Sequence, residues 1–452
     1  MARLFGTDGV RGIANRDLSC ELAMKIGACG AYVLTSEVHN PRILVGMDTR
    51  RSGDMLGAAL TAGICSVGGD VIDVGVIPTP ALAYLVRLYE ADAAVMVSAS
   101  HNTMEYNGIK WFSAKGYKLP DEIEDEIERM IQDDAPLQRP IGADVGHVIK
   151  AKRAASEYAS FLKSTARIRF DGLRVVLDCA NGASSRIAHE VFSELGADVI
   201  SCADEPDGNN INDKCGSLHP ERLQELVTET GADAGFAFDG DADRVIAADE
   251  FGNIVDGDRI LGICALAMKE EGRLKSDTLV ITVMSNLGLK VRMKERGVRI
   301  SETAVGDRYV MECMLKENYA LGGEQSGHVI FLDLNTTGDG MLTAIQVLNI
   351  LQSTQKSMSQ LASEIPIYPQ VLVNVRVENE RKQAAMDDAE LKVKIQSIGS
   401  ELGTSGRVLV RASGTEPLIR IMIEGQDEAV IDRHAITLAK ILERNHEGKI
   451  KG

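Results

Sequence analysis

The sequence predicts an α/β protein with three related domains on mixed, mostly parallel sheets and a smaller α+β domain at the C-terminus. The main observation is a strand–helix–strand pattern that starts at residues 42–50, 174–182 and 277–286. Each copy opens with a continuous β-branched run, which is typical of parallel strands buried on both faces. Repeated units of this kind place a chain in the α/β class. The length agrees, because 452 residues correspond to several domains of ~150 residues each.

The domain boundaries are expected where the composition changes. An apolar stripe on a predicted helix at 121–132 is followed by a stretch with Pro and Gly at 135–146, so the first domain should end near residue 150. The segment 249–253 has the composition of a hairpin turn that leads into the third unit. Two prolines within 366–369 interrupt helix and strand alike. The predicted domains are residues 1–150, 151–252, 253–365 and 366–452.

The composition excludes several classes of partner. A net charge of −17 disfavours binding to nucleic acid or to an anionic membrane. The N-terminus has no apolar signal segment, and no apolar run approaches the ~20 residues that span a bilayer. Eight cysteines without a CxxC pair indicate free, reduced thiols. We therefore expect a cytoplasmic protein that acts on small molecules, and an anionic ligand would need a local cluster of basic side chains.

The first segment with chemical potential, residues 96–102, follows a predicted buried strand at 93–97. Ligands of open α/β sheets bind beyond the carboxyl ends of the strands, where Ser100 and His101 should lie. Ser100 could act as a nucleophile or a phosphate carrier. However, adjacent residues on an extended chain point to opposite sides, so His101 is poorly placed as its base. Lys110 adds a cation nearby, and a polar loop without chemistry is the alternative.

The loop 238–244 carries carboxylates at every second position. Asp239, Asp241 and Asp243 share one face of an extended segment and can converge on a hard cation. An EF-hand is excluded, because Arg244 stands at the sixth position, where the turn requires Gly, and strands are expected on both sides. Three clustered carboxylates would repel one another without a cation. A divalent metal, Mg²⁺, is therefore the better account of this loop.

The Gly-rich segment 322–328 is a candidate for sugar binding. Glu324, Ser326 and His328 stand at alternate positions, and the glycines permit close approach of carboxylate and hydroxyl groups to sugar hydroxyls. An ordinary turn with a hydrogen-bonded His is the alternative.

A candidate phosphate site lies at 411–420, where two guanidinium groups, two hydroxyls and a Gly amide could surround one dianion. Near the N-terminus, Arg11 lies between two glycines, and a solvated turn is the alternative there. Together with Lys110 and Arg244 these groups supply the local positive charge that an anionic substrate requires. The phosphate-site candidates are Arg411, Ser413, Gly414, Thr415 and Arg420.

Taken together, these segments resemble the α-D-phosphohexomutase superfamily, in order and over the full chain. The likeness rests on residues 98–102, 239–244, 323–328 and 411–417. It implies four domains in a heart-shaped arrangement, each of which contributes one loop to the site. In chain order these are a phosphoserine loop, a metal loop, a sugar loop and a phosphate loop. A homodimer through the first domain is also implied as possible.

The resemblance further implies a role for each candidate residue. Ser100 would carry a phosphoryl group, and Mg²⁺ would lie between that phosphate and the three aspartates. The proton would be moved by His101, Lys110 or Arg11, which the sequence does not rank. The residues expected to bind substrate are Arg244, Glu324, Ser326, His328, Arg411, Ser413, Gly414, Thr415 and Arg420.

Within the superfamily, residues 3–12, 324–328 and 335–340 are most similar to the bacterial branch that interconverts glucosamine 6-phosphate and glucosamine 1-phosphate. The implied reaction is two phosphoryl transfers through a sugar bisphosphate, with glucosamine 1,6-bisphosphate or glucose 1,6-bisphosphate as activator. Its place would be amino-sugar synthesis for the cell wall. The alternatives are phosphomannomutase or phosphoglucomutase activity, a metal-dependent sugar phosphatase, or a binding module without activity. No residue is a clear partner for a 2-amino group.

Overall fold

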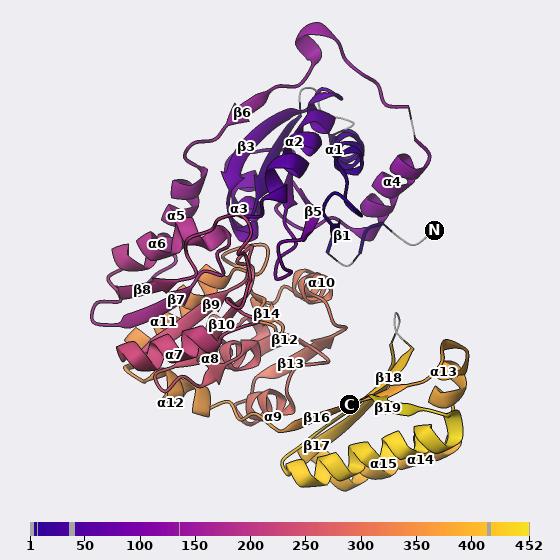
Figure 1. The fold of residues 1–452 in the computed structure, drawn as a ribbon. Coiled ribbons are helices and arrows are strands. Elements are labelled where there is room, and N and C mark those ends of the chain that lie inside the picture. The colour runs from indigo at the N-terminus through magenta and orange to yellow at the C-terminus, as the bar shows by residue number, and fades with distance from the viewer. Residues whose placement is uncertain (1–3, 7, 36–40, 135, 414–416, 452) are drawn as a thin grey trace. The chain divides into compact units, whose positions relative to one another are not determined.

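The structure is a computed structural model that describes residues 4–6, 8–35, 41–134, 136–413 and 417–451. The contacts divide the chain into two compact units (Figure 1). The first unit, residues 1–284 and 296–364, contains three sheets, and the second, residues 285–295 and 365–452, contains one. Within the described part of the chain, no helix is long and apolar enough to cross a membrane.

The first sheet has six strands in the order β1-β5-β4-β2-β3-β6. Strands β2, β3, β4 and β6 run parallel, whereas β5 and β1 add antiparallel at one edge. This order brings the carboxyl ends of β4 and β2 side by side in the middle of the sheet. The elements are β1 (Val10–Ile13), α1 (Cys20–Thr35), β2 (Arg42–Met47), α2 (Ser52–Cys65), β3 (Asp70–Val76), α3 (Thr79–Leu88), β4 (Ala93–Val97), β5 (Tyr106–Ser113), α4 (Asp121–Gln132) and β6 (Val148–Lys150).

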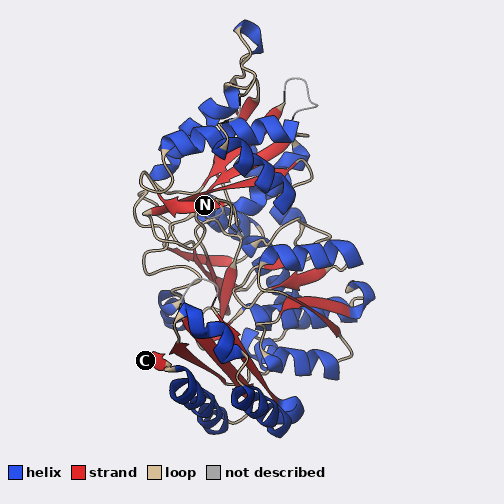
Figure 2. Cartoon of the chain, turned by 90° about the vertical axis from the view of Figure 1, so that its right-hand side faces the viewer, coloured by secondary structure: helices blue, strands red, loops and turns tan. Residues whose placement is uncertain are grey.

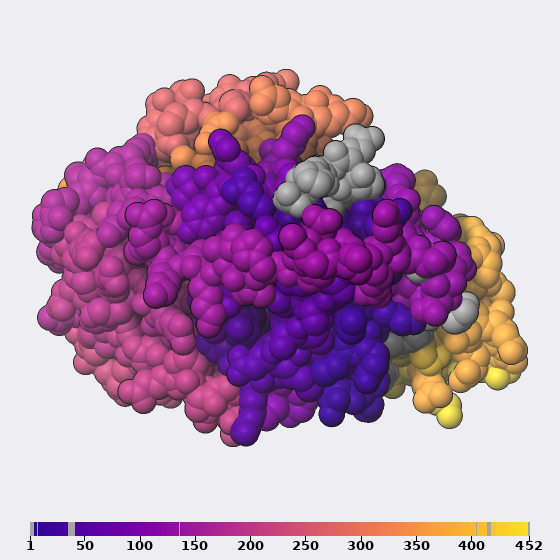
Figure 3. Space-filling model, turned by 90° about the horizontal axis from the view of Figure 1, so that it is seen from above, coloured from indigo at the N-terminus to yellow at the C-terminus, as the bar shows by residue number. Residues whose placement is uncertain are grey.

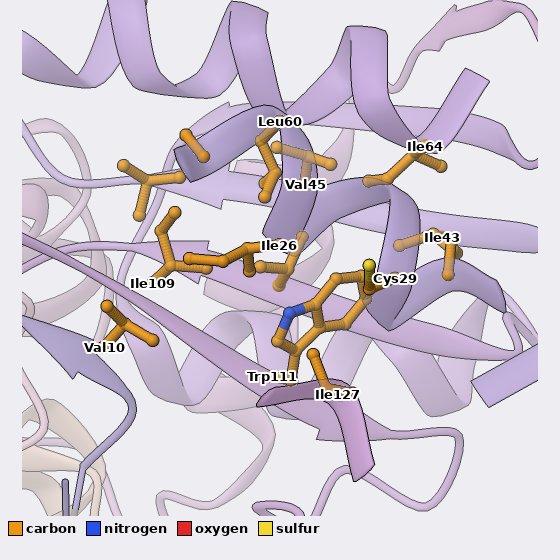
Figure 4. Packing of buried hydrophobic residues seen from close by; sticks show 14 of the residues in the cluster. Val10, Ile26, Cys29, Ile43, Val45, Leu60, Ile64, Ile109, Trp111 and Ile127 are labelled. Carbon is orange, nitrogen blue, oxygen red and sulfur yellow. The ribbon is translucent and has the colours of Figure 1, made fainter. Parts of the chain in front are cut away.

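The core of this domain lies between the sheet and helices α1, α2 and α4. The indole of Trp111 on β5 is its largest side chain and packs among Ile26, Cys29 and Ile127 (Figure 4). Gly30 of α1 permits this approach, because a Cβ at that position would lie 2.4 Å from Trp111 Cζ2. The chain between α4 and β6 then crosses the outer surface of the domain with most of its residues exposed (Figure 3).

The second sheet has the order β11-β10-β9-β7-β8 and is parallel from β8 through β9. Strands β9 and β10 are antiparallel, with Phe238 opposite Val245, so residues 239–244 form the loop that joins them. Strands flank this loop on both sides, in agreement with the exclusion of an EF-hand. The elements are α5 (Ala154–Ser164), β7 (Arg174–Asp178), α6 (Ala188–Glu194), β8 (Asp198–Cys202), α7 (Glu221–Thr230), β9 (Ala234–Phe238), β10 (Val245–Asp249), β11 (Ile254–Val255) and α8 (Gly257–Glu270).

The third sheet has the order β13-β12-β14-β15, with β12 parallel to β13 and β14. The antiparallel hairpin of β14 and β15 joins Gly323 to Val329, so the predicted sugar loop forms its tip. The elements are β12 (Thr278–Thr282), β13 (Arg299–Thr303), α10 (Asp307–Glu317), β14 (Leu321–Gly323), β15 (Val329–Phe331), α11 (Gly340–Thr354) and α12 (Met358–Ser363).

The second unit is an antiparallel sheet in the order β17-β18-β16-β19, with helices packed against it (Figure 2). Both types of sheet agree with the sequence, and the predicted fold class, α/β domains followed by a smaller α+β domain, is confirmed. The elements are α9 (Leu287–Glu295), β16 (Gln370–Arg376), α13 (Asn379–Met386), α14 (Ala389–Leu402), β17 (Gly406–Ala412), β18 (Leu418–Gly425), α15 (Glu428–His446) and β19 (Lys449–Lys451).

Candidate active site

Ser100 lies in the turn that follows β4, where it is 1% exposed. Its φ of 52° is in the left-handed region, which is uncommon for a residue other than Gly. In this conformation its hydroxyl donates to Asp239 Oδ2 at 2.6 Å and lies 3.3 Å from His101 Nδ1. The structure thus brings the serine loop of the first sheet against the aspartate loop of the second.

The three aspartates of the 239–244 loop form one buried group. One oxygen from each of Asp239, Asp241 and Asp243 lies within 4.8 Å of the other two. Asp241 Oδ2 accepts from the Thr79 hydroxyl at 2.6 Å. Two buried oxygens, Asp241 Oδ1 and Asp243 Oδ1, have no hydrogen-bond donor among the described residues. Buried carboxylate oxygens without donors are costly unless a cation binds them, so this donor set fits a Mg²⁺ ion.

The surroundings of the triad shift the pKa values of Asp239 and Asp243 in opposite directions. Burial, followed by the negative charges of Asp243 and Asp241, raises the pKa of Asp239 well above its ordinary value. Burial acts in the same direction on Asp243, but His328, 3.7 Å away, and the cations Lys110 and Arg244 outweigh it and lower the pKa of Asp243. Neighbouring cations therefore favour the ionised form of Asp243. The ionised form of Asp239 is disfavoured by its surroundings, and a bound cation would favour it.

Lys110 on β5 is buried and lies between two carboxylates, 3.2 Å from Asp241 Oδ2 and 3.0 Å from Asp8 Oδ2. Burial would lower the pKa of Lys110, but Asp241 and Asp8 outweigh it and raise this pKa. Asp8 also pairs with Lys118, which bridges to Asp307 at the start of α10. Lys110 is therefore a fixed cation next to the triad.

Arg11, His101 and Arg244 also lie at the site. Arg11 pairs with Asp8 and donates to the Asn102 side chain at 3.2 Å. Arg244 Nη1 lies 3.2 Å from His101 Nδ1. Burial, together with the guanidinium groups of Arg244 and Arg11, lowers the pKa of His101 to about 4. Burial would also lower the pKa of Arg244, but the surrounding carboxylates outweigh it and raise this pKa.

The sugar-loop candidates occupy the tip of the β14–β15 hairpin. Ser326 is exposed, and Glu324 is half-buried and accepts from the Gly306 N–H at 3.0 Å. His328 is buried between two carboxylates, with Nδ1 3.7 Å from Asp243 and Nε2 3.6 Å from Asp307. Burial would lower the pKa of His328, but these carboxylates outweigh it and raise this pKa. His328 thus joins the sugar loop to the aspartate loop.

The phosphate-loop candidates belong to the second unit. Arg411 on β17 and Arg420 on β18 are directly opposite in antiparallel register, so their side chains emerge on the same face. Like charges directly opposite are destabilising, and an anion between them would relieve the repulsion. Lys382 adds a third cation, because its ammonium donates to the Ser413 carbonyl at 2.7 Å. The candidates Gly414 and Thr415 lie outside the described residues.

Models of the phosphoglucomutase/phosphomannomutase family match almost the whole chain. They cover its α/β/α domain I at residues 2–137, domain II at 156–252, domain III at 256–368 and the C-terminal domain at 372–441. The chain belongs to this family.

Full-length relatives and solved structures of the phosphoglucomutase/phosphomannomutase family agree with this assignment. The phosphoglucosamine mutases of Thermoanaerobacter sp. (strain X514) and Clostridium perfringens are 56% identical over 98% of this chain and 99% of their own. A family protein from Burkholderia thailandensis has a TM-score of 0.84 at 25% identity, with 99% of each chain covered. The fold is also shared with Aspergillus fumigatus N-acetylphosphoglucosamine mutase in complex with GlcNAc-6P and magnesium. The TM-score is 0.68 at 18% identity, over 98% of this chain and 96% of that one.

Several residues contact the site but are absent from the sequence-based candidates; besides Asp8 and Thr79, these include Arg50, Lys118, Asn212 and Asp307. Arg50 and Asn212 donate to carbonyl oxygens of the serine loop. Lys118 and Asp307 pair with each other beside His328. For Arg50 a signal existed, since it follows β2, whose carboxyl end lies next to that of β4. For Lys118, Asn212 and Asp307, no local pattern indicates the contact.

Proposed function

We propose that this chain is a phosphoglucosamine mutase, an isomerase that interconverts glucosamine 6-phosphate and glucosamine 1-phosphate in the synthesis of cell-wall precursors. The observation that carries the proposal is the buried Ser100 hydroxyl, which lies 2.6 Å from Asp239 within a cluster of carboxylates that fits a metal ion. The specific substrate is supported by the full-length relatives at 56% identity, which are named phosphoglucosamine mutase.

In the proposed reaction Ser100 donates and later recovers a phosphoryl group. The free hydroxyl oxygen of the sugar phosphate bonds to phosphorus while the bond from phosphorus to Ser100 Oγ breaks. The proton lost by the sugar hydroxyl is balanced by a proton taken up at Ser100 Oγ. The sugar bisphosphate then turns over in the site, and the same step in reverse returns the other phosphoryl group to Ser100. Glucosamine 1,6-bisphosphate, or glucose 1,6-bisphosphate, would serve as activator by loading Ser100 at the start.

Ser100, Asp239, Asp241 and Asp243 would hold the Mg²⁺, which when bound would neutralise charge on the transferring phosphoryl group. Lys110 lies beside Asp241 as a fixed cation and would stabilise the same charge without reorganising. Arg244, next to His101, would do the same. These preorganised charges supply the positive field that the overall charge of −17 lacks.

Among the three candidates for moving the proton, His101 is favoured. Its Nδ1 lies 3.3 Å from Ser100 Oγ, and its lowered pKa, about 4, keeps the ring neutral near pH 7. Against the effect of burial, the pKa of Lys110 is instead raised by Asp241 and Asp8, which favours its cationic form, and Arg11 pairs with Asp8. Both would act as electrostatic partners of the phosphoryl group.

Two sets of residues would bind the substrate. Glu324, Ser326 and His328 would contact sugar hydroxyls common to both binding orientations. The non-reacting phosphate would be bound by Arg411, Ser413, Gly414, Thr415 and Arg420, and the opposed pair Arg411 and Arg420 supports this role. A homodimer through the first domain, a cytoplasmic location and the four domain boundaries given above stay predictions.

The proposal is tested by phosphorus NMR in a competition assay. The protein, with Mg²⁺ and a trace of sugar bisphosphate, is offered glucosamine, glucose and mannose 6-phosphates together, and each 1-phosphate is followed as it forms. Preference for glucosamine phosphate is the expected result. Faster conversion of glucose or mannose phosphate would refute the specific substrate and retain the mutase chemistry. Inorganic phosphate as the main product would refute the mutase and indicate a phosphatase.

A further inference from the structure

The carbonyl oxygens of the serine loop are bound from behind by one buried guanidinium group. Arg50 Nη2 donates to the carbonyls of Ser100 at 2.9 Å and Asn102 at 2.8 Å. Its Nη1 donates to the carbonyl of Tyr106 at 3.1 Å and to that of Thr103. The Arg50 side chain has no exposed surface. One side chain therefore fixes three carbonyls of the turn that carries the nucleophile and a fourth at the start of β5.

A second donor reaches the same loop from the segment between β8 and α7. Asn212 Nδ2 donates to the carbonyls of Ser100 at 2.8 Å and Asn102 at 2.9 Å, which are the two that also accept from Arg50. Asn212 is 7% exposed and has a left-handed φ of 56°. Gly240 of the aspartate loop also approaches closely, since a Cβ there would lie 2.6 Å from the Ser100 carbonyl oxygen. The serine loop is thus held between two domains.

The guanidinium group is itself fixed by a buried carboxylate. Asp48 Oδ2 accepts from Arg50 Nε at 2.8 Å and from the Ser98 hydroxyl at 2.6 Å. Ser98 Oγ in turn accepts from the Ser100 N–H at 3.0 Å. These hydrogen bonds form a closed network that begins and ends at Ser100. Both the N–H and the carbonyl of Ser100 are bonded within it.

This arrangement has an electrostatic consequence for a phosphorylated Ser100. A carbonyl oxygen that faced the phosphoryl group would repel it, whereas a carbonyl bonded to Arg50 and Asn212 is turned toward those donors. The left-handed conformation of Ser100 is unfavourable for an L-residue and persists only where its surroundings hold it. Arg suits this task better than Lys, because its planar fork can serve several acceptors at once.

We propose that Arg50 and Asn212 are positioning residues that form a two-domain clamp on the serine loop, holding Ser100 Oγ against Asp239 with the loop carbonyls turned away from the phosphoryl group. The clamp sets the rate of phosphoryl transfer and leaves substrate affinity nearly unchanged. This inference rests on the proposed function, in which Ser100 carries the phosphoryl group.

The test compares two glycine substitutions in one loop of the full-length protein. Asn212→Gly removes the two hydrogen bonds and keeps the left-handed backbone that Gly tolerates. Lys214→Gly is the matched control, because Lys214 also has a left-handed φ, of 53°, but its side chain is exposed. We expect Asn212→Gly to lower kcat by ~10-fold to 100-fold, the loss that a displaced reacting group produces, with KM changed by less than ~3-fold. Lys214→Gly should match the wild type in both.

A second readout does not depend on turnover. Amide hydrogen exchange at residues 98–106 should be faster in Asn212→Gly than in Lys214→Gly, and Arg50→Lys should show the same acceleration. Unchanged kcat in a folded Asn212→Gly protein, or a raised KM at constant kcat, would overturn the clamp. If the wild type lacks phosphoserine and mutase turnover, the proposed function is wrong. The exchange rates then test the clamp by themselves, and equal rates in both glycine variants would overturn it.

Discussion

Metal binding should stabilise the first unit against unfolding. Removal of one carboxylate should leave the metal-free protein at least as stable, and it should reduce the stabilisation that the metal adds. The ligand oxygens of Asp239, Asp241 and Asp243 lie within 4.8 Å of one another. Two unit charges at that separation repel by about 3 kcal/mol at an effective dielectric constant of ~20. Lys110, 3.2 Å from Asp241, offsets part of this repulsion. The metal-free protein therefore contains a destabilising cluster that a divalent cation would relieve.

The expected size of the effect follows from mass action. Free Mg²⁺ at 100 times its dissociation constant raises the free energy of unfolding by about 2.7 kcal/mol. Asp239→Asn removes one ligand together with one negative charge. If the variant binds Mg²⁺ 100-fold more weakly, the same concentration adds only about 0.4 kcal/mol. Because burial and the other two aspartates raise the pKa of Asp239, the neutral amide should make the metal-free variant at least as stable as the metal-free wild type.

The assay is urea unfolding with and without Mg²⁺, followed by the fluorescence of Trp111. This is the only tryptophan of the chain, and it is buried in the first unit, which also contains the triad. Asp54→Asn, at an exposed position of α2, is the control and should respond to Mg²⁺ as the wild type does. The reasoning would be refuted if Mg²⁺ left the wild-type midpoint unchanged, or if it shifted the Asp239→Asn midpoint equally.

Four further outcomes are expected. Ser100→Ala should lower kcat by ~10³-fold or more and abolish the phosphoserine signal in phosphorus NMR, and retention of either would contradict its role. In urea unfolding, Gly57→Ala should stabilise by up to about 1 kcal/mol through helix propensity, since its Cβ meets open space. Gly30→Ala should destabilise by about 1–3 kcal/mol, because its Cβ would lie 2.4 Å from Trp111, and a gain would disprove the packing argument. Asp388 caps α14 through the Leu391 N–H, which lowers its pKa to about 2, so Asp388→Ala should cost about 1 kcal/mol at pH 7. That difference, present above the unfolded pKa of ~3.9, should vanish as the pH falls to about 2, as measured by circular dichroism at each pH.

The sequence predicts well those structural features that depend on residues close together in the sequence. The β-branched runs indicate the strands, and the alternate spacing of Asp239, Asp241 and Asp243 indicates a shared ligand set because a short loop holds them together. The carbonyl acceptors of Arg50 and Asn212 could not be predicted in this way, although the position of Arg50 after a predicted strand places it at the edge of the sheet where ligands bind. Their acceptors are backbone carbonyls 50 and 112 residues away, and every residue type has a carbonyl, so no side-chain pattern indicates the pairing. Only the fold brings these groups together: β2 lies beside β4 in the first sheet, and the loop between β8 and α7 reaches the serine loop.

Lys118 and Asp307 illustrate the same limit for charges. They are 189 residues apart, and each alone has the sequence context of a solvated residue. In the fold they neutralise each other beside His328 and Asp8, so charged side chains alternate in sign through the interior of the site. This alternation explains how an acidic chain can accept an anion. A phosphoryl dianion and a divalent cation bring equal and opposite charge, so their joint arrival leaves the net charge of the cluster unchanged. Either alone would unbalance it, so Mg²⁺ should bind more tightly to the protein phosphorylated at Ser100 than to the unphosphorylated protein, as isothermal titration of Mg²⁺ into both forms would show; equal affinity would mean that the aspartates alone set the affinity.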